Sequence, residues 1–350
     1  MGRPFIFGSV SSGSAAKSLV VSLDNATKAY GATVIITATP TGVTPTSYIF
    51  IAIDSGNNSW VIAEQAGNVY NYVIDKYIDR IVVVADESND LADEAAITVT
   101  LPTNTGTFIT NTSITDLDII NASAEFETDI NSILAKMLMI SPMFGGTAAL
   151  HKFNLLNPVD TDAGFRLTFS GGWTHGADGA KPNGTNGYAN THFNPNTEMT
   201  SGDTGMSFYI NSTNTGGTAP YVGGCFNGSS GVLLRTFGSF DSVGKGYCYG
   251  GLSFTGSIAN SQGMYSVMTN GTLTKVYKDG AEVASGAFAG TIPNLVAYLG
   301  AYNSSGSPTS YSPQGISFFA MHEYLSAAEI TTFHSAVLTA QENLSRAKTW

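Results

Sequence analysis

Apolar and polar residues alternate along most of this chain, and the period of the alternation changes in two places. Between residues 19 and 101, apolar residues recur at every second position in short runs, which is the pattern of strands that bury one face. Clusters of Gly, Asn, Asp and Ser separate the runs, as turns require. The predicted strands are SLVVSL, ATVIITATP, TSYIFIAID, RIVVVADES and AAITVTLP. They predict a small β-sandwich over residues 19–101, preceded by an arm at residues 1–18.

The first change of period falls in a connector, residues 102–148. It begins with PTNTGTFITNTS, which predicts a loop or an extended segment. The following stretch predicts a helix, because Phe126, Ile130, Ile133 and Met137 follow a 4-3-4 spacing that lines one face. Two interpretations of this face remain open: it packs against the neighbouring domain, or it meets symmetry-related copies of the chain. The repeat is too short to predict a coiled coil.

Strand-like alternation returns from residue 149 to about residue 325. The predicted strands are GFRLTFSGGW, MSFYIN, GVLLRTFG, YCYGGLSF, MYSVMTNG, TKVYKDGAEV, NLVAYLGAYN and GISFFAMHEYL. The clearest hairpin contains Asp279 and Gly280, which supply the two positive-φ residues that a type I′ turn requires. Antiparallel strands in this number and length predict a jelly roll of two sheets.

The second change of period marks a C-terminal helix. Ser326 and Glu329 fit the S-x-x-E capping box, in which each side chain satisfies a backbone N–H of the other residue. Ile330, Phe333 and Val337 then mark an apolar face. We therefore expect the chain to end in a helix that closes the second sandwich.

Two resemblances give these regions more specific folds. The strands of residues 19–101 resemble immunoglobulin-like (Ig-like) and PKD-type modules. Residues 149–345 resemble concanavalin A-like and laminin G-like domains in three segments: GGWTHGADGAKPNGTNGYANTHFNP, VYKDGAEVAS and GISFFAMHEYLSAAEI. The resemblances imply an all-β protein. Its parts would be an N-terminal Ig-like β-sandwich at 19–101, a short helical connector at 102–148, and a concanavalin A-like jelly-roll sandwich at 149–350 closed by the C-terminal helix.

A narrower resemblance concerns FGGTAALHKFNLLNPVDTDAGFRLTFSGGWTH, which resembles a segment of tailed-bacteriophage structural proteins. It implies a non-enzymatic virion protein of the head or tail, namely a fibre, decoration protein or adhesin that displays a lectin-like domain to host-surface glycans. The implied partners are other capsid or tail proteins and further copies of the chain, as a homotrimer. The alternatives are a decoration protein without a ligand, a secreted bacterial lectin and a glycosidase.

Composition narrows the class of partner. The chain has 15 Lys and Arg against 26 Asp and Glu, a net charge of −11. Such an acidic chain repels phosphate backbones and anionic lipids, so neither nucleic acid nor a membrane is an expected partner. The N-terminus MGRPFIFGSVSSGSAAKSL lacks the apolar core of a signal peptide, and no apolar run has the length of a membrane span. We therefore expect synthesis in the host cytoplasm, and the resemblance to bacteriophage structural proteins implies a place in the virion.

The Gly- and Asn-rich segment at residues 171–195 is the main candidate for a ligand site. Sugars are usually held by an aromatic platform together with amides and carboxylates, and this segment supplies all three. Its ligand-binding candidates are Trp173, His175, Asp178, Asn183, Asn186 and Tyr188. The same Gly and Asn residues also fit the positive-φ positions of turns between twisted strands, so a turn and a ligand loop both remain open.

Metal chemistry has few candidates. Ca²⁺ needs several anionic oxygen ligands, for which Asp178 and Asp203 are the candidates, and no other cofactor is expected. The histidines are scattered, and neither cysteine lies in a Cys/His cluster, so zinc is not expected. Cys225 and Cys248 form either one disulfide or two thiols on neighbouring strands.

Catalysis by the second sandwich is not expected. Concanavalin A-like hydrolases of β-glucans carry an E-x-D-x-x-E motif, which this sequence lacks. Glycoside hydrolysis requires two carboxylates at a fixed separation. The acids that a glycosidase interpretation would use here are Asp160, Asp162 and Asp203.

Overall fold

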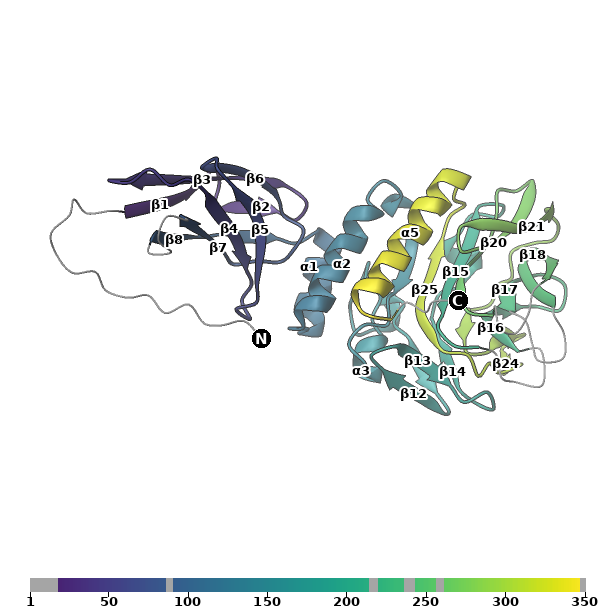
Figure 1. The fold of residues 1–350 in the computed structure, drawn as a ribbon. Coiled ribbons are helices and arrows are strands. Elements are labelled where there is room, and N and C mark those ends of the chain that lie inside the picture. The colour runs from purple at the N-terminus through teal and green to yellow at the C-terminus, as the bar shows by residue number, and fades with distance from the viewer. Residues whose placement is uncertain (1–17, 86–90, 214–219, 236–242, 256–260, 347–350) are drawn as a thin grey trace. The chain divides into compact units, whose positions relative to one another are not determined.

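The computed structural model describes residues 18–85, 91–213, 220–235, 243–255 and 261–346 (Figure 1). The expected arm therefore lies outside the described residues, apart from its last position. In the described part the protein is mostly β, with a C-terminal helix. The chain forms two compact units, unit 1 (Met1–Pro102) and unit 2 (Thr103–Trp350). No described helix is both long and apolar enough to cross a bilayer.

Unit 1 is built from two antiparallel sheets and a short parallel pair. The three-stranded sheet has the order β1 (Ser18–Leu23), β3 (Thr33–Thr41), β6 (Val69–Val73). The four-stranded sheet has the order β5 (Ser59–Gln65), β4 (Tyr48–Ile53), β7 (Arg80–Ala85), β8 (Leu91–Ala96). The parallel pair joins β2 (Thr27–Ala29) to β9 (Thr98–Thr100).

The alternation of side chains along these strands produces the core of unit 1. In β3 the expected inward face of Val34, Ile36 and Ala38 is fully buried, whereas Ile35 between them is exposed. The inward residues of β4, such as Phe50, are buried in the same cluster. Because successive side chains of a strand point to opposite faces, a period of two was enough to predict this face.

Unit 2 holds two larger sheets, each of eight strands in the described residues. The first has the order β12 (Trp173–Gly176), β13 (Gly179–Pro182), β25 (Ile316–His322), β15 (Thr204–Ile210), β19 (Gly263–Thr269), β20 (Leu273–Lys278), β21 (Ala281–Ala287), with β10 (Met137–Ser141) also paired to β25. The second has the order β11 (Thr168–Ser170), β14 (Tyr188–Asn190), β22 (Tyr298–Leu299), β16 (Tyr221–Phe226), β17 (Gly231–Arg235), β18 (Val243–Thr255), with β23 (Tyr302–Ser304) paired to β16 and to β24 (Ser307–Thr309).

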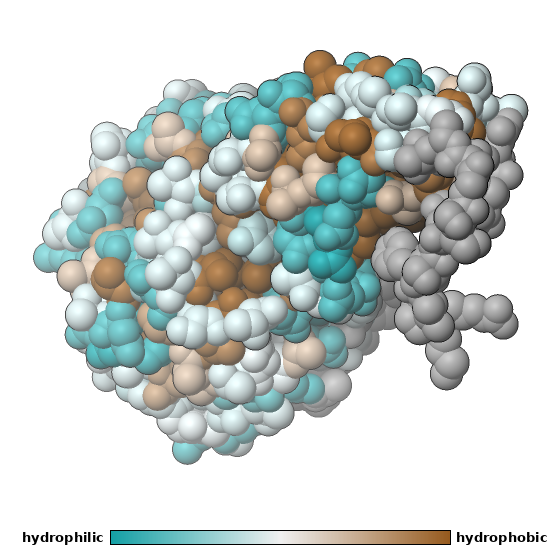
Figure 2. Space-filling view, turned by 90° about the vertical axis from the view of Figure 1, so that its left-hand side faces the viewer, coloured by the Kyte–Doolittle hydropathy of each residue, from teal (hydrophilic) through white to brown (hydrophobic). Residues whose placement is uncertain are grey.

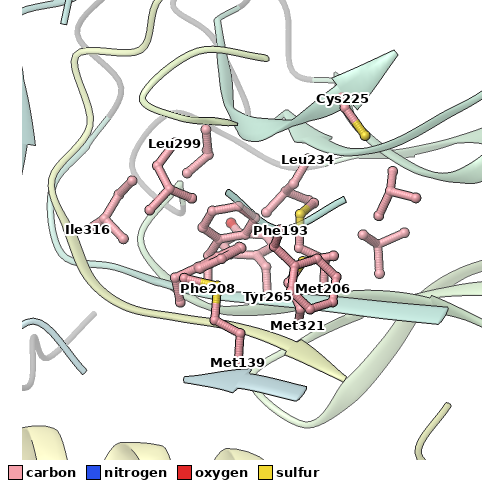
Figure 3. Packing of buried hydrophobic residues seen from close by; sticks show 14 of the residues in the cluster. Met139, Phe193, Met206, Phe208, Cys225, Leu234, Tyr265, Leu299, Ile316 and Met321 are labelled. Atoms are coloured by element: carbon pink, nitrogen blue, oxygen red, sulfur yellow. The ribbon is translucent and has the colours of Figure 1, made fainter. Parts of the chain in front are cut away.

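Large apolar side chains form the main core of unit 2 (Figure 3). Phe208 of β15, Tyr265 of β19 and Met321 of β25 come from the first sheet, and Leu234 of β17 comes from the second. All four are fully buried. Burying a side chain of this size contributes about 1.5–3 kcal/mol, so this core is the main source of the stability of unit 2.

Two helices cover the other face of the first sheet. The helices α2 (Leu117–Asp129) and α5 (Ala327–Asn343) lie side by side next to β25 (Figure 1). The ring of Phe318 on β25 packs edge-on against Phe126 of α2 at 5.6 Å and Phe333 of α5 at 5.8 Å. The expected capping box at the start of α5 is confirmed, because the Glu329 carboxylate accepts the Ser326 N–H and the Ser326 hydroxyl accepts the Glu329 N–H.

One helix stands where the sequence predicted a loop or an extended segment. This helix, α1 (Thr103–Thr112), consists mostly of Thr and Asn, which are weak helix formers. Its start is stabilised from outside, because the buried carboxylate of Glu127 on α2 accepts the backbone N–H groups of Asn104 (3.0 Å) and Thr105 (2.6 Å). A cap supplied by a residue more than 20 positions away leaves no local pattern to recognise.

The long helix predicted through Met137 is also corrected. Helix α2 ends at Asp129, a short 3₁₀ helix follows at Leu134–Lys136, and Met137 begins β10. The 4-3-4 residues Phe126, Ile130, Ile133 and Met137 are all buried nevertheless. Pairing of β10 with β25 in the sheet overrides the helical period at its end. The remaining short helices are Ala148–His151 (α3), Asp162–Gly164 (3₁₀) and Pro195–Glu198 (α4).

The predicted hairpin is confirmed. Strands β20 and β21 pair with Lys278 opposite Ala281, which leaves a two-residue turn. Asp279 and Gly280 have φ values of 49° and 82°, as the turn type requires.

Candidate functional site

The Gly- and Asn-rich segment singled out above forms a hairpin and the loop that follows it. Strands β12 and β13 pair with Gly176 opposite Gly179, so Ala177 and Asp178 form an exposed two-residue turn. The next turn lies between Pro182 and Tyr188, at the other end of β13. The structure therefore divides the candidate residues between two ends of one short strand.

The aromatic candidates pack within unit 2. The indole N–H of Trp173 donates to the carbonyl oxygens of Ser170 (3.2 Å) and Tyr188 (3.1 Å), and its ring meets Phe169 edge-on at 5.1 Å. The Tyr188 ring lies 5.1 Å from that of Tyr298. Both rings are half-buried, and their contacts are those of residues that hold the sheet together.

The two asparagines of the segment stabilise its turn. The Asn183 side-chain oxygen accepts the backbone N–H groups of Thr185 (3.0 Å), Asn186 (3.1 Å) and Gly187 (3.0 Å). The Asn186 side-chain oxygen accepts the Asn183 amide (2.8 Å) and the Gly172 N–H (3.1 Å). These oxygens would otherwise be the ones to bind an ion, so the loop chemistry is that of an Asx turn.

Replacing Asn183 by Ala should destabilise unit 2 by about 2 kcal/mol, because three backbone N–H groups lose their acceptor together. Urea unfolding of the variant measures the change. The exposed Asn131 is a matched control, since its replacement by Ala should change the free energy of unfolding by less than about 0.5 kcal/mol. Equal effects at both positions would contradict the turn assignment.

The two aspartates proposed for calcium lie at opposite ends of β25. The backbone oxygen of Asp178 accepts the Ser317 hydroxyl (2.5 Å), near the start of that strand. The Asp203 carboxylate accepts the Tyr324 N–H (2.6 Å), just past its end. At about 3.3 Å per residue, the two sites are roughly 20 Å apart. The described residues contain no group of three His, Cys, Asp or Glu able to hold a metal ion.

His175 forms a pair with a histidine that the sequence did not connect to it. The Nδ1 atoms of His175 and His151 are 3.0 Å apart. The Gly146 N–H donates to His151 Nε2 (3.1 Å), so the proton of His151 is on Nδ1 and points to His175. Burial lowers the pKa of His151 to about 3 and also lowers the pKa of His175. Both rings are therefore neutral at pH 7.

A second buried histidine pair is linked through two serines. His322 on β25, Ser207 on β15, Ser266 on β19 and His334 on α5 form a chain with contacts of 2.7, 2.5 and 2.9 Å. His322 Nδ1 faces the Glu323 carbonyl (2.7 Å), so it carries the proton. The Gly280 N–H donates to His334 Nδ1 (2.6 Å), so His334 carries its proton on Nε2. The hydrogen bonds consequently run in one direction, from His334 through both serines to His322.

This chain of hydrogen bonds connects helix α5 to strands β15, β19 and β25 of the first sheet. Burial lowers the pKa of His322 to about 4 and that of His334 to about 3. The sequence did not predict the serine link between these histidines. Because every group in the chain has a partner inside the protein, it stabilises the fold and offers no open position to a substrate.

The cysteines are free thiols. Cys225 on β16 and Cys248 on β18 both lie opposite Val232 of β17, so one strand separates them. The sequence predicted either a disulfide or two thiols on neighbouring strands. The two thiols instead lie on strands separated by β17, and they form no disulfide. Burial raises the pKa of Cys225 to about 12 and raises the pKa of Cys248 as well, so neither is a nucleophile near pH 7.

The carboxylates that a glycosidase interpretation would use are held in surface ion pairs. Asp160 binds Lys152 (2.6 Å) and Arg166 (2.7 Å), and Asp162 binds the same arginine (3.1 Å). These pairs lower the pKa of Asp160. Asp203 lies elsewhere, at the far end of β25. The three acids therefore do not form one site.

A cavity of unit 2 lies beside the turn at Ala177 and Asp178. It has a volume of about 450 Å³, within the usual range for a small-ligand site. We call it the helix-end cavity. Its walls are the α1–α2 turn (113–116), the first turn of α2 (118 and 119), Gly145 and Gly146, Leu150, Ala177 and the residues at the end of α5 (343–346).

The lining of the helix-end cavity mixes polar and apolar groups. Asp116 and Asp118 supply carboxylates at the start of α2, and Asn343 supplies an amide from the end of α5. Ile119 and Leu150 supply apolar surface. Asp116 also caps α2, since one of its carboxylate oxygens accepts the N–H groups of Asp118 (3.0 Å) and Ile119 (3.4 Å).

Two helix ends and a buried cation lie at the same cavity. Ser113 and Ser345 have φ values of 55° and 54° just after α1 and α5, the left-handed conformation in which many helices end. The Arg346 guanidinium is 2% exposed and donates to the carbonyl oxygens of Pro142 (3.2 Å) and Met143 (3.2 Å). Its Nε finds no partner among the described residues.

The sequence did not identify this cavity. Only Ala177 belongs to the segment that it singled out, and the remaining walls come from the connector, from Leu150 of α3, and from residues 343–346 at and after the end of α5. A lone arginine after a helix and an Asp near the start of another are too common to indicate a site. The cavity exists because α2 and α5 pack side by side, which is a tertiary feature.

No family model matches the chain, and neither does any curated protein. Among solved structures, domain 4 of a GH43 extracellular arabinanase from Geobacillus stearothermophilus, in complex with arabinotriose, is similar over 48% of this chain and 81% of that chain, with 15% identity and a TM-score of 0.34. A Trypanosoma rangeli sialidase in complex with sialic acid is similar over 92% of this chain and 53% of that chain, with 14% identity and a TM-score of 0.42. A variant of the NanB sialidase from Streptococcus pneumoniae is similar over 39% of this chain and 24% of that chain, with 12% identity and a TM-score of 0.29. The chain thus spans about half of the first sialidase and a quarter of the second.

These comparisons correct the functional interpretation of the sequence. The solved structures named above belong to carbohydrate-active enzymes, and none of them is a virion protein. The interpretation as a non-enzymatic phage structural protein is therefore withdrawn, and with it the expectation that catalysis is excluded. TM-scores this low assign neither a fold nor an activity to this chain. A function has to be argued from its own residues.

Proposed function

We propose that this protein recognises carbohydrate, and that the helix-end cavity of unit 2 receives a sugar residue. We also propose Ig-like and concanavalin A-like folds for units 1 and 2. The three- and four-stranded sheets of unit 1 and the two larger sheets around one core in unit 2 support these assignments. A place in a virion and assembly as a homotrimer stay predictions from the sequence.

The lining of the cavity is the observation that carries this proposal. A sugar presents hydroxyl groups around its edge and C–H groups on its faces. Asp116 and Asp118 offer carboxylate acceptors for the hydroxyls, while Ile119 and Leu150 offer apolar contact for the C–H groups. The Asn343 amide nitrogen donates to the Glu125 carboxylate, so the side-chain oxygen is the group that Asn343 offers. A purely apolar ligand would leave these carboxylates unsolvated, and a phosphate would meet two negative charges.

Glycan-array screening of the full chain, followed by calorimetric titration of the strongest ligand, tests the proposal. Replacing Asp116 by Asn keeps the helix cap, because Asn is an equally good N-cap residue, and removes the charge. We expect this variant and Asp118→Asn to weaken binding by about tenfold each. The matched control Asp162→Asn, which lies outside the cavity, should bind normally. A silent array, or equal affinity in all the variants, would overturn the proposal.

A second candidate function is hydrolysis of the bound glycan. The presence of two carboxylates, Asp116 and Asp118, in one cavity favours it, since glycoside hydrolysis uses such a pair. Incubating the array ligand with the protein and measuring the release of reducing ends tests it. Release that both Asn variants abolish would establish hydrolysis, whereas binding without release would leave recognition alone.

A further inference from the structure

A second site lies in unit 1, on the side where its two sheets remain apart. On one side, β1 and β8 approach each other, and the Val21 N–H donates to the Asp93 carboxylate (2.8 Å) across the gap. On the other side, β5 and β6 are the outermost strands of their sheets. Neither of these two strands has a strand neighbour on its outer side within the described residues.

A groove of about 470 Å³ runs between β5 and β6. We call it the edge groove, and its lining comes from residues 60–62, 70–73, 75 and 76. Trp60, Ile62 and Tyr70 are half-buried against the core of unit 1. Figure 2 shows one face of the molecule, on which strongly apolar residues (brown) lie among hydrophilic ones. Exposed aromatic surface in a groove is typical of a ligand site.

The rim of the edge groove carries polar groups beside this aromatic surface. On β6 the exposed Asn71 and Val73 alternate with Tyr70 and Tyr72, so their side chains point to the opposite face of the strand from those rings. The Asp75 carboxylate accepts the Tyr72 hydroxyl (2.6 Å) at one end. Rings with a carboxylate close by form part of the arrangement that the sequence analysis expected at residues 171–195. In the structure that arrangement is found in unit 1.

The cation of the groove is distinctive. Within the described part of unit 1, Lys28 pairs with Asp24 (2.7 Å) and Arg80 pairs with Glu94 (3.5 Å). Lys76 has no carboxylate within 4 Å among the described residues, and its ammonium lies 5.2 Å from the centre of the Trp60 ring. Unit 1 contains 5 Lys and Arg against 10 Asp and Glu, and among its described cations Lys28 and Arg80 are held in ion pairs whereas Lys76 is not. The ring holds this cation at the groove, where it remains available to an anion.

We propose that the edge groove binds an acidic sugar residue. The anionic group of the sugar pairs with the Lys76 ammonium, and the C–H face of its ring packs on Trp60 and Tyr70. An acidic peptide would satisfy Lys76 and leave the aromatic faces without a matching partner, and a neutral sugar would leave Lys76 unpaired. This site is distinct from the helix-end cavity and does not depend on the function proposed for it.

Calorimetry with defined soluble ligands tests this inference on the full chain. The probes are tetragalacturonate, a chondroitin sulfate tetrasaccharide, neutral maltotetraose and pentaglutamate, so that carboxylate, sulfate and peptide sources of negative charge are separated. We expect at least one acidic oligosaccharide to bind, and maltotetraose and pentaglutamate to bind at least about tenfold more weakly. Lys76→Gln and Trp60→Ala should each weaken the binding by about tenfold or more.

Matched variants make the result decisive. Lys28→Gln removes a paired lysine of the same unit and should leave the affinity unchanged. Trp60→Phe keeps a ring and should retain most of the binding, which separates loss of the site from misfolding in Trp60→Ala. Asp116→Asn should have no effect, because it lies in unit 2. No binding of any acidic oligosaccharide would overturn the inference. So would equal binding of maltotetraose or pentaglutamate, or an unchanged affinity in Lys76→Gln.

Discussion

Lowering the pH from about 7.5 to about 5 should destabilise unit 2 by on the order of 6 kcal/mol, most of the stability of an ordinary domain. Three buried histidines cause this loss. Burial lowers the folded-state pKa of His151 and His334 to about 3 and that of His322 to about 4. In the unfolded chain each of them titrates near pH 6.5.

The sign follows from proton binding. Between pH 6.5 and the folded pKa values, the unfolded chain binds protons that the folded protein does not, so the free energy of unfolding falls as the pH falls. At pH 5 each histidine lies about 1.5 units below its unfolded pKa, which corresponds to about 2 kcal/mol. The surface carboxylates with lowered pKa values, such as Asp160 and Glu329, lose their contribution only below about pH 4.5. The two effects therefore occupy different pH windows.

Urea unfolding at several pH values measures this dependence of stability on pH. The protein used carries Phe at positions 60 and 350, so that its tryptophan fluorescence comes from Trp173 and reports on unit 2. Replacing His334 by Asn keeps an acceptor for the Gly280 N–H and removes one titrating group. The loss between pH 6.5 and 5 should then shrink by about a third. A free energy of unfolding that stays constant down to pH 5 would mean that the folded histidines accept protons freely.

The sequence predicted those elements of the fold that are determined by residues close together in the chain, and it missed those that depend on distant residues. The alternation in β3, the Asp279–Gly280 turn and the Ser326–Glu329 cap are local, and all three are confirmed. Helix α1 was missed, because its cap comes from Glu127 of another helix. The end of α2 was misplaced, because pairing of β10 with β25 decides it.

The candidate sites show the same difference between local sequence features and contacts that arise only in the folded chain. Trp173 and Trp60 are both tryptophans in strands, and nothing local distinguishes them. The indole of Trp173 is held by two carbonyl oxygens inside unit 2, whereas Trp60 lies at the open side of a sandwich, beneath a lysine that has no ion-pair partner among the described residues. The openness of a sheet edge and the absence of an ion-pair partner are properties of the folded chain. A sequence pattern can supply the residue types of a site but not these properties.

Replacing Arg346 by Met should destabilise unit 2 by about 3 kcal/mol or more. Its guanidinium donates to Pro142, Met143 and Ser317, whose carbonyl oxygens come from two separate segments. Met fills much of the same volume but cannot donate, so three buried carbonyl oxygens lose their partner at once. Lys at this position should give an intermediate loss, because one ammonium cannot match the fork of a guanidinium. The unfolding experiment described for the histidines measures both variants.

The matched control is Arg166→Met, on the surface of the same unit. Arg166 pairs with Asp160 and Asp162 in partly exposed ion pairs, and its loss should cost less than about 1 kcal/mol. The contrast between Arg346→Met and Arg166→Met tests how burial of the Arg346 charge affects stability. Burial lowers the pKa of Arg346 to about 10, so the fold holds an unfavourably placed charge and compensates it with carbonyl oxygens and the Phe144 ring, 5.4 Å away. If removing the charge relieved more strain than the lost hydrogen bonds cost, Arg346→Met would be neutral or stabilising, as happens when some buried ion pairs are replaced by apolar residues. That outcome would indicate that the arginine is kept for the helix-end cavity and not for stability.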